Sequence, residues 1–112
     1  MDNLKGAADS LYEVLSVKRH AVRPGFRITE LTITPTQKVP WHRHSVVQDT
    51  FYLLEGQLRI LLRDPHEEVS LLPGNTYSVR AGRLHLVANA GATNAAFLVL
   101  QGIGEYDFIP LD

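Results

Sequence analysis

Three histidines and one aspartate have the spacing of a candidate metal site. His42 and His44 form a His-x-His pair, Asp49 follows five residues after His44, and His85 lies much farther along the chain. On a β-strand, alternate side chains point to the same face, so both rings of the pair converge on one side. Three neutral imidazoles and one carboxylate are ligands that suit a divalent first-row metal such as Mn, Fe, Co, Ni or Zn.

Each member of this set also has an ordinary structural explanation. A His-x-His pair occurs on solvated strands, His85 alone is typical of a hydrogen-bonded core histidine, and Asp49 alone is typical of a loop residue that bonds nearby backbone. The other two histidines have no such companions. His20 lies among basic residues and His66 lies in a polar turn, so we expect both at the surface. The joint spacing of the four residues is what favours a metal site.

The elements that must position these residues are predicted to be short β-strands. Glu55-Gly56 predicts a tight hairpin, and residues 73–75 predict a second turn. Many short strands at this spacing are typical of an antiparallel sandwich or barrel, so the sequence predicts an all-β fold. The apolar or alternating runs of strand length are residues 26–34, 50–54, 57–63, 69–72, 76–79, 84–88 and 95–101.

The chain is predicted to be a single domain, because no repeat, low-complexity segment or long linker interrupts it. Residues 1–25 are expected to form an N-terminal extension of the same domain, and residues 26–112 the barrel itself. Within the extension, Asp9 or Ser10 is a suitable cap for a short helix over residues 9–15. The same stretch is also compatible with a strand, since periodicity does not decide so short a segment.

The spacing of the candidate ligands resembles the two sequence motifs of the cupin superfamily. The first motif is Gly-x5-His-x-His-x3,4-Glu-x6-Gly, and its positions are occupied here by Thr36, His42, His44, Asp49 and Gly56. The second motif is Gly-x5-Pro-x-Gly-x2-His-x3-Asn, and its positions are occupied by Gly74, Arg80, Gly82, His85 and Asn89. Together the motifs run from residue 36 to residue 89 and cover about half of the chain.

The resemblance implies a jelly-roll barrel, or double-stranded β-helix, with one metal ion inside it. His42, His44 and His85 would then be the imidazole ligands, and Asp49 would stand at the glutamate position. The motif glycines would form turns, and Asn89 would have a structural role. Aspartate is one methylene shorter than glutamate. The resemblance therefore leaves open whether Asp49 binds the ion directly, binds it through water, or leaves a site of three histidines.

A mostly apolar substrate pocket is expected beside the ion. Because side chains alternate along a strand, Phe51 and Leu53 share the face of Asp49, and Val87 shares the face of His85. The other candidates for this pocket are apolar and polar residues on neighbouring strands. The predicted pocket residues are Phe51, Leu53, Tyr77, Val87, Phe97 and Gln101. Such a pocket suits a small aromatic or enolic molecule.

Composition excludes several other kinds of function. The chain has 112 residues and no cysteine, which excludes disulfides, iron–sulfur clusters and thiol nucleophiles. Eleven basic and twelve acidic residues give a formal net charge of -1, so nothing favours nucleic acid or an anionic membrane as a partner. No apolar run is long enough to span a bilayer, and the first residues lack the pattern of a secretory signal. We therefore expect a soluble cytoplasmic protein, with a mature secreted chain as the alternative.

The function that the resemblance implies is metal chemistry on a small organic substrate, with an oxygenase as the leading hypothesis. A site with few protein ligands keeps coordination positions open for substrate and dioxygen. Cupins also include isomerases, lyases and non-catalytic binders, and the fold does not choose among them. A non-catalytic binding or sensing module and a metal-dependent isomerase or lyase are therefore the alternatives.

A homodimer is also expected, because small cupins usually pair through their sheets. The apolar strand over residues 95–101 and the tail over residues 106–111 are the candidates for the interface. The alternative for the tail is that it folds back over its own barrel.

Overall fold

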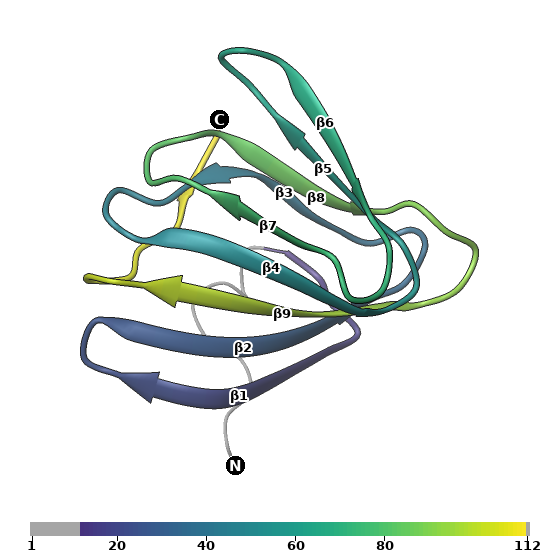
Figure 1. Ribbon diagram of the computed structural model, residues 1–112, viewed down its shortest axis with the longest axis horizontal. Helices are drawn as coiled ribbons and strands as arrows, with labels where there is room; N and C mark the ends of the chain where they lie inside the picture. Colours follow the sequence, from purple (N-terminus) through teal and green to yellow (C-terminus); the bar gives the residue numbers. More distant parts are fainter. Residues whose placement is uncertain (1–11, 112) are drawn as a thin grey trace.

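The structure is a computed structural model that describes residues 12–111. It is built from β-strands joined by turns, and the all-β prediction is confirmed (Figure 1). The strands are β1 (Ser16–Arg23), β2 (Phe26–Ile33), β3 (Lys38–Arg43), β4 (Gln48–Glu55), β5 (Leu58–Leu62), β6 (Glu67–Leu71), β7 (Thr76–Val79), β8 (His85–Asn89), β9 (Ala95–Gly102) and β10 (Ile109–Pro110). No helix within residues 12–111 is long and apolar enough to cross a membrane.

The strands form two antiparallel sheets that pack face to face. The first sheet has the order β1-β2-β9-β4-β7, and the second has the order β10-β3-β8-β5-β6. From β2 to β5, and again from β7 to β9, the chain moves between the two sheets, which is the winding of a jelly roll. This arrangement of the strands confirms the predicted barrel class (Figure 1). The core is formed by buried side chains from both sheets.

Alternation along the strands places the core. In β4, Asp49, Phe51 and Leu53 are buried while the residues between them are more exposed. In β5, Leu58 and Ile60 are fully buried in the same way. Burying one such side chain contributes about 1.5–3 kcal/mol relative to leaving it in water, so this period-two pattern fixes which face of each strand points inward.

The turn between β4 and β5 requires glycine. Gly56 has φ +83°, and a Cβ atom built on it would lie 2.6 Å from the carbonyl oxygen of Asn94. Only glycine adopts this backbone without strain and lets the neighbouring loop approach so closely. Asn89 supports the same end of the barrel, because its Nδ2 donates to the carbonyl oxygens of Ile33 at 3.1 Å and Thr93 at 2.8 Å.

Three strands lie outside the runs named from the sequence. β1 falls within the segment expected as an N-terminal extension, and it pairs with β2 along its whole length. β3 contains the first histidine of the pair, and β10 adds two residues to its edge. Of the stretch considered as a short helix, residues 9–11 lie outside the described residues, and residues 12–15 are not helical.

Candidate metal centre and its cavity

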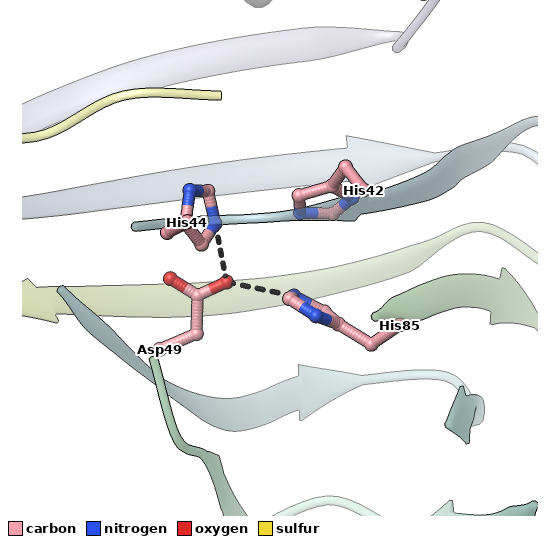
Figure 2. Close-up of side chains that lie close together, drawn as sticks. All are labelled: His42, His44, Asp49 and His85. Atoms are coloured by element: carbon pink, nitrogen blue, oxygen red, sulfur yellow. Dashed lines mark hydrogen bonds and ion pairs between the residues drawn. The ribbon is translucent and has the colours of Figure 1, made fainter. Parts of the chain in front are cut away.

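The four candidate ligands come together between the two sheets (Figure 2). His42 and His85 are direct partners across β3 and β8 of the second sheet, and His44 follows the end of β3. Asp49 projects from β4 of the first sheet. One ligating atom from each residue lies within 4.8 Å of the others, and no member of the group is more than 3% exposed.

A bulge in β3 turns His42 toward the interior. Val39 pairs with Val87, and the next pair along the ladder is His42 with His85, so β3 has one residue more than β8 between these pairs. Val39 and His42 are three residues apart and would face opposite sides of a regular strand, yet both are buried. The extra residue therefore re-aims the histidine, which is a common use of bulges beside functional sites.

Each histidine is held by a hydrogen bond from its Nδ1 to a backbone carbonyl. His42 donates to the oxygen of Pro40 at 2.7 Å, and His85 donates to the oxygen of Arg83 at 2.8 Å. His44 donates to the carbonyl of Asp107, 63 residues farther along the chain. Since a carbonyl only accepts, Nδ1 bears the proton in all three rings. In each neutral ring, Nε2 therefore presents a lone pair, which is the form that binds a metal.

Asp49 reaches this group despite its short side chain. Its Oδ2 lies 2.9 Å from Nε2 of His44 and 3.1 Å from Nε2 of His85 (Figure 2). Lone pairs repel a carboxylate at these distances unless a cation, either an extra proton or a metal ion, neutralises the contact. The donor set therefore fits a divalent metal, which His42, His44, Asp49 and His85 would hold.

Burial and charge shift the pKa values of the group in ways that suit a ligand set. Burial is the main cause that lowers the pKa of His42 to about 3, which keeps this ring neutral. Burial also lowers the pKa of His44, but the hydrogen bond and charge of Asp49 outweigh it, and the net pKa is raised. Burial raises the pKa of Asp49, yet the two neighbouring histidines lower it to well below its usual range. Asp49 is therefore ionised.

A cavity adjoins three of the four residues, His42, His44 and Asp49, and about 460 Å³ of space lies in it when the part open to solvent at its mouth is counted. The residues that line it are Tyr12, Arg19, Thr29, Leu31, Val39, His42, His44, Asp49, Phe51, Val87, Val99, Gln101, Tyr106 and Phe108.

Half of the predicted pocket residues line this cavity, and half do not. Phe51, Val87 and Gln101 line it. Leu53 and Phe97 also face inward and are fully buried in the core, but they are not among the residues that line the cavity. Tyr77 on β7 is partly buried and packs against that core, and it does not line the cavity either. Strand alternation gives the face of a residue but not its depth.

Sequence reasoning missed the walls of the cavity contributed by the chain ends. Arg19 and Thr29 come from β1 and β2, and Tyr12 precedes β1. The tail folds back over its own barrel, where β10 pairs with β3 and the ring of Phe108 stacks on His42 with centroids 4.4 Å apart. The aromatic content of the tail was a signal for a covered position, but the sequence alone left its place open.

The other two histidines lie at the surface, as expected. Nε2 of His20 is 2.9 Å from Oε1 of Glu30, and the His20 side chain is 48% exposed. His66 is 3.9 Å from Glu68, and its side chain is 70% exposed. Neither belongs to the buried group.

Comparison with known protein families identifies the family of this chain. The family model described as "Cupin domain" matches residues 29–106, which is more than half of the chain. The chain belongs to the cupin family. The two cupin motifs recognised in the sequence are thus confirmed as marks of the family, and both fall inside the matched range.

Solved structures give the same fold. A conserved protein with a double-stranded β-helix domain from Klebsiella pneumoniae has a TM-score of 0.76 and 16% identity, covering 99% of this cupin and 100% of that chain. A cupin-2 domain protein from Shewanella frigidimarina has a TM-score of 0.66 and 20% identity, covering 83% of this chain and 86% of that one.

An oxalate oxidase is similar with a TM-score of 0.72 and 17% identity, covering 78% of this cupin and 46% of that chain. This cupin therefore spans about half the length of the oxalate oxidase chains it matches. At these identities the likeness shows the fold alone. None of the curated protein sequences compared with the chain matches it.

Proposed function

We propose that this cupin binds one divalent transition metal through His42, His44, His85 and Asp49 and is a metal-dependent oxygenase of a small organic substrate. The observation that supports the metal site is the arrangement of donors. One donor atom from each of the four residues lies within 4.8 Å of the others, and every ring is fixed by its own Nδ1 hydrogen bond.

The side chains that line the cavity favour a reaction whose chemistry comes from the metal and not from a protein base. Apart from the four proposed ligands, the ionisable side chains that line it within the described residues are Tyr12, Arg19 and Tyr106. An arginine stays protonated, and burial raises the pKa of Tyr106, so neither is a base near neutral pH. A bound transition metal with open positions polarises an oxygen ligand and, when it is iron, supports dioxygen chemistry. An enolic or aromatic substrate suits the apolar part of the walls.

Metal content and oxygen uptake test this proposal. We expect about one equivalent of a divalent transition metal per chain in the purified protein, and we expect the His42→Ala/His44→Ala variant to lose nearly all of it. The matched control is His20→Ala/His66→Ala, which removes two surface histidines and should keep the metal. Full retention of metal by the His42→Ala/His44→Ala variant refutes the site.

The oxygenase step is tested separately from the site. We expect the iron-loaded protein to consume dioxygen with at least one member of a panel of small enols and aromatic acids. The scarcity of bases in the cavity also favours a second function, a binding or sensing module without turnover. Tight binding of panel members with no oxygen uptake under any metal would favour that module and contradict the oxygenase.

We also propose that the chain forms a homodimer through the outer face of the first sheet. The support is a set of apolar side chains on that face, where Tyr52 of β4 pairs with Leu98 of β9, and Leu100 of β9 pairs with Ile28 of β2. Light scattering should give about twice the mass of one chain, and a Leu98→Arg variant should halve it. A wild-type mass equal to one chain contradicts the dimer.

A further inference from the structure

We infer that the natural ligand of the cavity is a small organic carboxylate, and that Arg19 binds its carboxylate group while the apolar walls hold its body. Nothing in the family relationship assigns a role to Arg19, which lies on the first strand, outside both cupin motifs and outside the matched residues 29–106. The inference rests on the proposed function for one point only, that a metal ion occupies the four-residue site beside this ligand.

Strand register places two arginines on the inner face of the first sheet. Arg19 of β1 pairs directly with Thr29 of β2, a buried residue that lines the cavity. Arg27 of β2 pairs directly with Gln101 of β9, which is also buried and lines the cavity. Because directly opposed residues of antiparallel strands point to the same face, both guanidinium groups lie on the interior side of the sheet.

These two cations have no acidic partner among the described residues. Within residues 12–111, neither Arg19 nor Arg27 forms an ion pair with an aspartate or glutamate. Nε of Arg27 is buried without a hydrogen-bond partner among the described residues. The guanidinium of Arg27 instead lies 3.9 Å from the ring centroid of Tyr106. Burial lowers the pKa of Arg27, and the charge of Arg19 adds to that effect, so the two groups repel each other in this wall.

Arg19 has the geometry of an anion receptor. It lines the cavity, and its Nη1 donates to Oγ1 of Thr29 at 3.1 Å, which orients the planar group. That bond uses one of five N–H donors and leaves the rest of the fork for a bidentate contact with a carboxylate. Arg27 does not line the cavity, so we assign it a supporting charge behind Tyr106 and not the contact itself.

The net charge of the cavity is positive when a divalent ion is bound, which favours an anionic ligand. Asp49 is the only acidic side chain that lines it within the described residues. A divalent ion beside Asp49 leaves one positive charge, and Arg19 adds another. Uncompensated charge in a partly desolvated space is costly, and an anionic ligand neutralises it.

The remaining walls select an organic anion over an inorganic one. Leu31, Val39, Phe51, Val87 and Val99 line the cavity between the polar groups. Contact between such a surface and a hydrocarbon group is favourable. The same surface offers no hydrogen bonds to the outer oxygens of phosphate or sulfate. A carboxylate on a small apolar body matches both parts of the cavity.

The test compares acids with their uncharged amides on the zinc-loaded protein. The probes are acetate with acetamide and benzoate with benzamide, and their dissociation constants are measured by NMR titration. The variant is Arg19→Gln, and the matched control is Lys18→Gln, because Lys18 is the exposed neighbour on the same strand and faces the other side. Arg19→Lys keeps the charge without the fork and guards against an effect of folding alone. Zinc content and melting temperature are measured for every variant.

In the wild type and in Lys18→Gln, we expect at least one acid to bind about tenfold more tightly than its amide, the effect of a charge-assisted hydrogen bond. Arg19→Gln should abolish that preference, and Arg19→Lys should keep part of it. No preference in the wild type, including no binding of either probe, overturns the inference. So does an equal preference in wild type and Arg19→Gln, which would place the carboxylate on the metal alone. Absence of bound zinc from the wild type would refute the proposed function instead, while loss of acid preference in Arg19→Gln would still support the role of Arg19.

Discussion

Gln101 holds the carboxylate of Asp49 by a hydrogen bond from its Nε2 to Oδ1 at 2.8 Å. The two residues are directly opposed on β9 and β4, and both are buried. With Oδ1 engaged in this way, Oδ2 faces the Nε2 atoms of His44 and His85. Hydrogen bonds of this kind, from a neighbour to a ligand, orient the ligand and tune its affinity for the ion.

Removing this hydrogen bond should weaken metal binding. We expect Gln101→Leu to lower zinc affinity by roughly 10–100-fold, the usual effect of losing a partner of a metal ligand. Competition with a chromogenic chelator measures the affinity. Gln48→Leu is the control, because Gln48 is exposed at the start of β4. Equal affinity in both variants would mean that Gln101 does not position Asp49.

Neutralising Asp49 should have a larger effect. Asp49→Asn keeps the size of the side chain but removes the charge, so we expect zinc affinity to fall by at least about 100-fold, more than for an indirect partner. The control is Asp64→Asn, since Asp64 is an exposed turn residue with φ 61°, a conformation that asparagine tolerates. If Asp49→Asn binds zinc as tightly as the control, the three histidines alone form the site.

Metal removal should make stability depend on pH. In the metal-free protein the raised pKa of His44 means that its ion pair with Asp49 stabilises the fold below about pH 6.5, the usual histidine pKa. That stabilisation is lost as the pH rises through the raised pKa. We therefore expect the melting temperature of the chelated protein to fall between pH 6.5 and 9, while the zinc-loaded protein changes little.

The same linkage has the opposite sign for His42. Its pKa is lowered to about 3, so acid favours the unfolded chain between about pH 6.5 and 3. The lowered pKa of Asp49 adds to this loss only below about pH 4, as its carboxylate becomes protonated. Calorimetry from about pH 3 to pH 9 measures both effects, the loss of stability above about pH 6.5 and the loss below it. A metal-free melting temperature that keeps rising from pH 6.5 to 9 would contradict the role given to the His44–Asp49 pair.

The tail should protect the site. Phe108 stacks on His42 with ring planes 13° apart and on Tyr12 with centroids 5.6 Å apart. Since Phe108 is only partly buried, Phe108→Ala should cost about 1–2 kcal/mol of unfolding free energy and speed the loss of metal to a chelator. Urea denaturation and stopped-flow chelation measure these effects. Leu111→Ala, at a more exposed tail position, should change neither.

Phe97 should matter for the core and not for the site. It is fully buried and packs near Phe51, with ring centroids 6.1 Å apart. Phe97→Ala should lower the free energy of unfolding by about 3–5 kcal/mol through the cavity it leaves, while the folded fraction keeps its metal. Ile103→Ala, at a side chain 88% exposed, should have an effect within about 0.5 kcal/mol. Loss of metal from folded Phe97→Ala protein would contradict this and would indicate that Phe97 contributes to the cavity wall.

Local patterns were enough to predict the fold class and the group of candidate ligands. Alternation along β4 correctly oriented Asp49, Phe51 and Leu53 toward the interior, because a strand has only two faces. The motif spacing selected His42, His44 and His85 out of five histidines, and the structure brings these three together with Asp49.

The other features of the fold and of the site could not be predicted from local patterns, because they depend on contacts between distant parts of the chain. The inward position of Arg19 follows from its register with Thr29 across β1 and β2, which no local pattern specifies. The place of Phe108 depends on the pairing of β10 with β3, more than 60 residues away in sequence. Which inward-facing residues line the cavity, as Phe51 does and Leu53 does not, depends on how the two sheets pack.

The proposed metal site can be located by anomalous diffraction from crystals of the zinc-loaded protein, recorded above and below the zinc absorption edge. We expect one strong peak per chain at about 2.0–2.2 Å from Nε2 of His42, His44 and His85 and from a carboxylate oxygen of Asp49. A strong peak bound elsewhere on the chain, or no peak among these four residues in crystals that contain zinc, would contradict it.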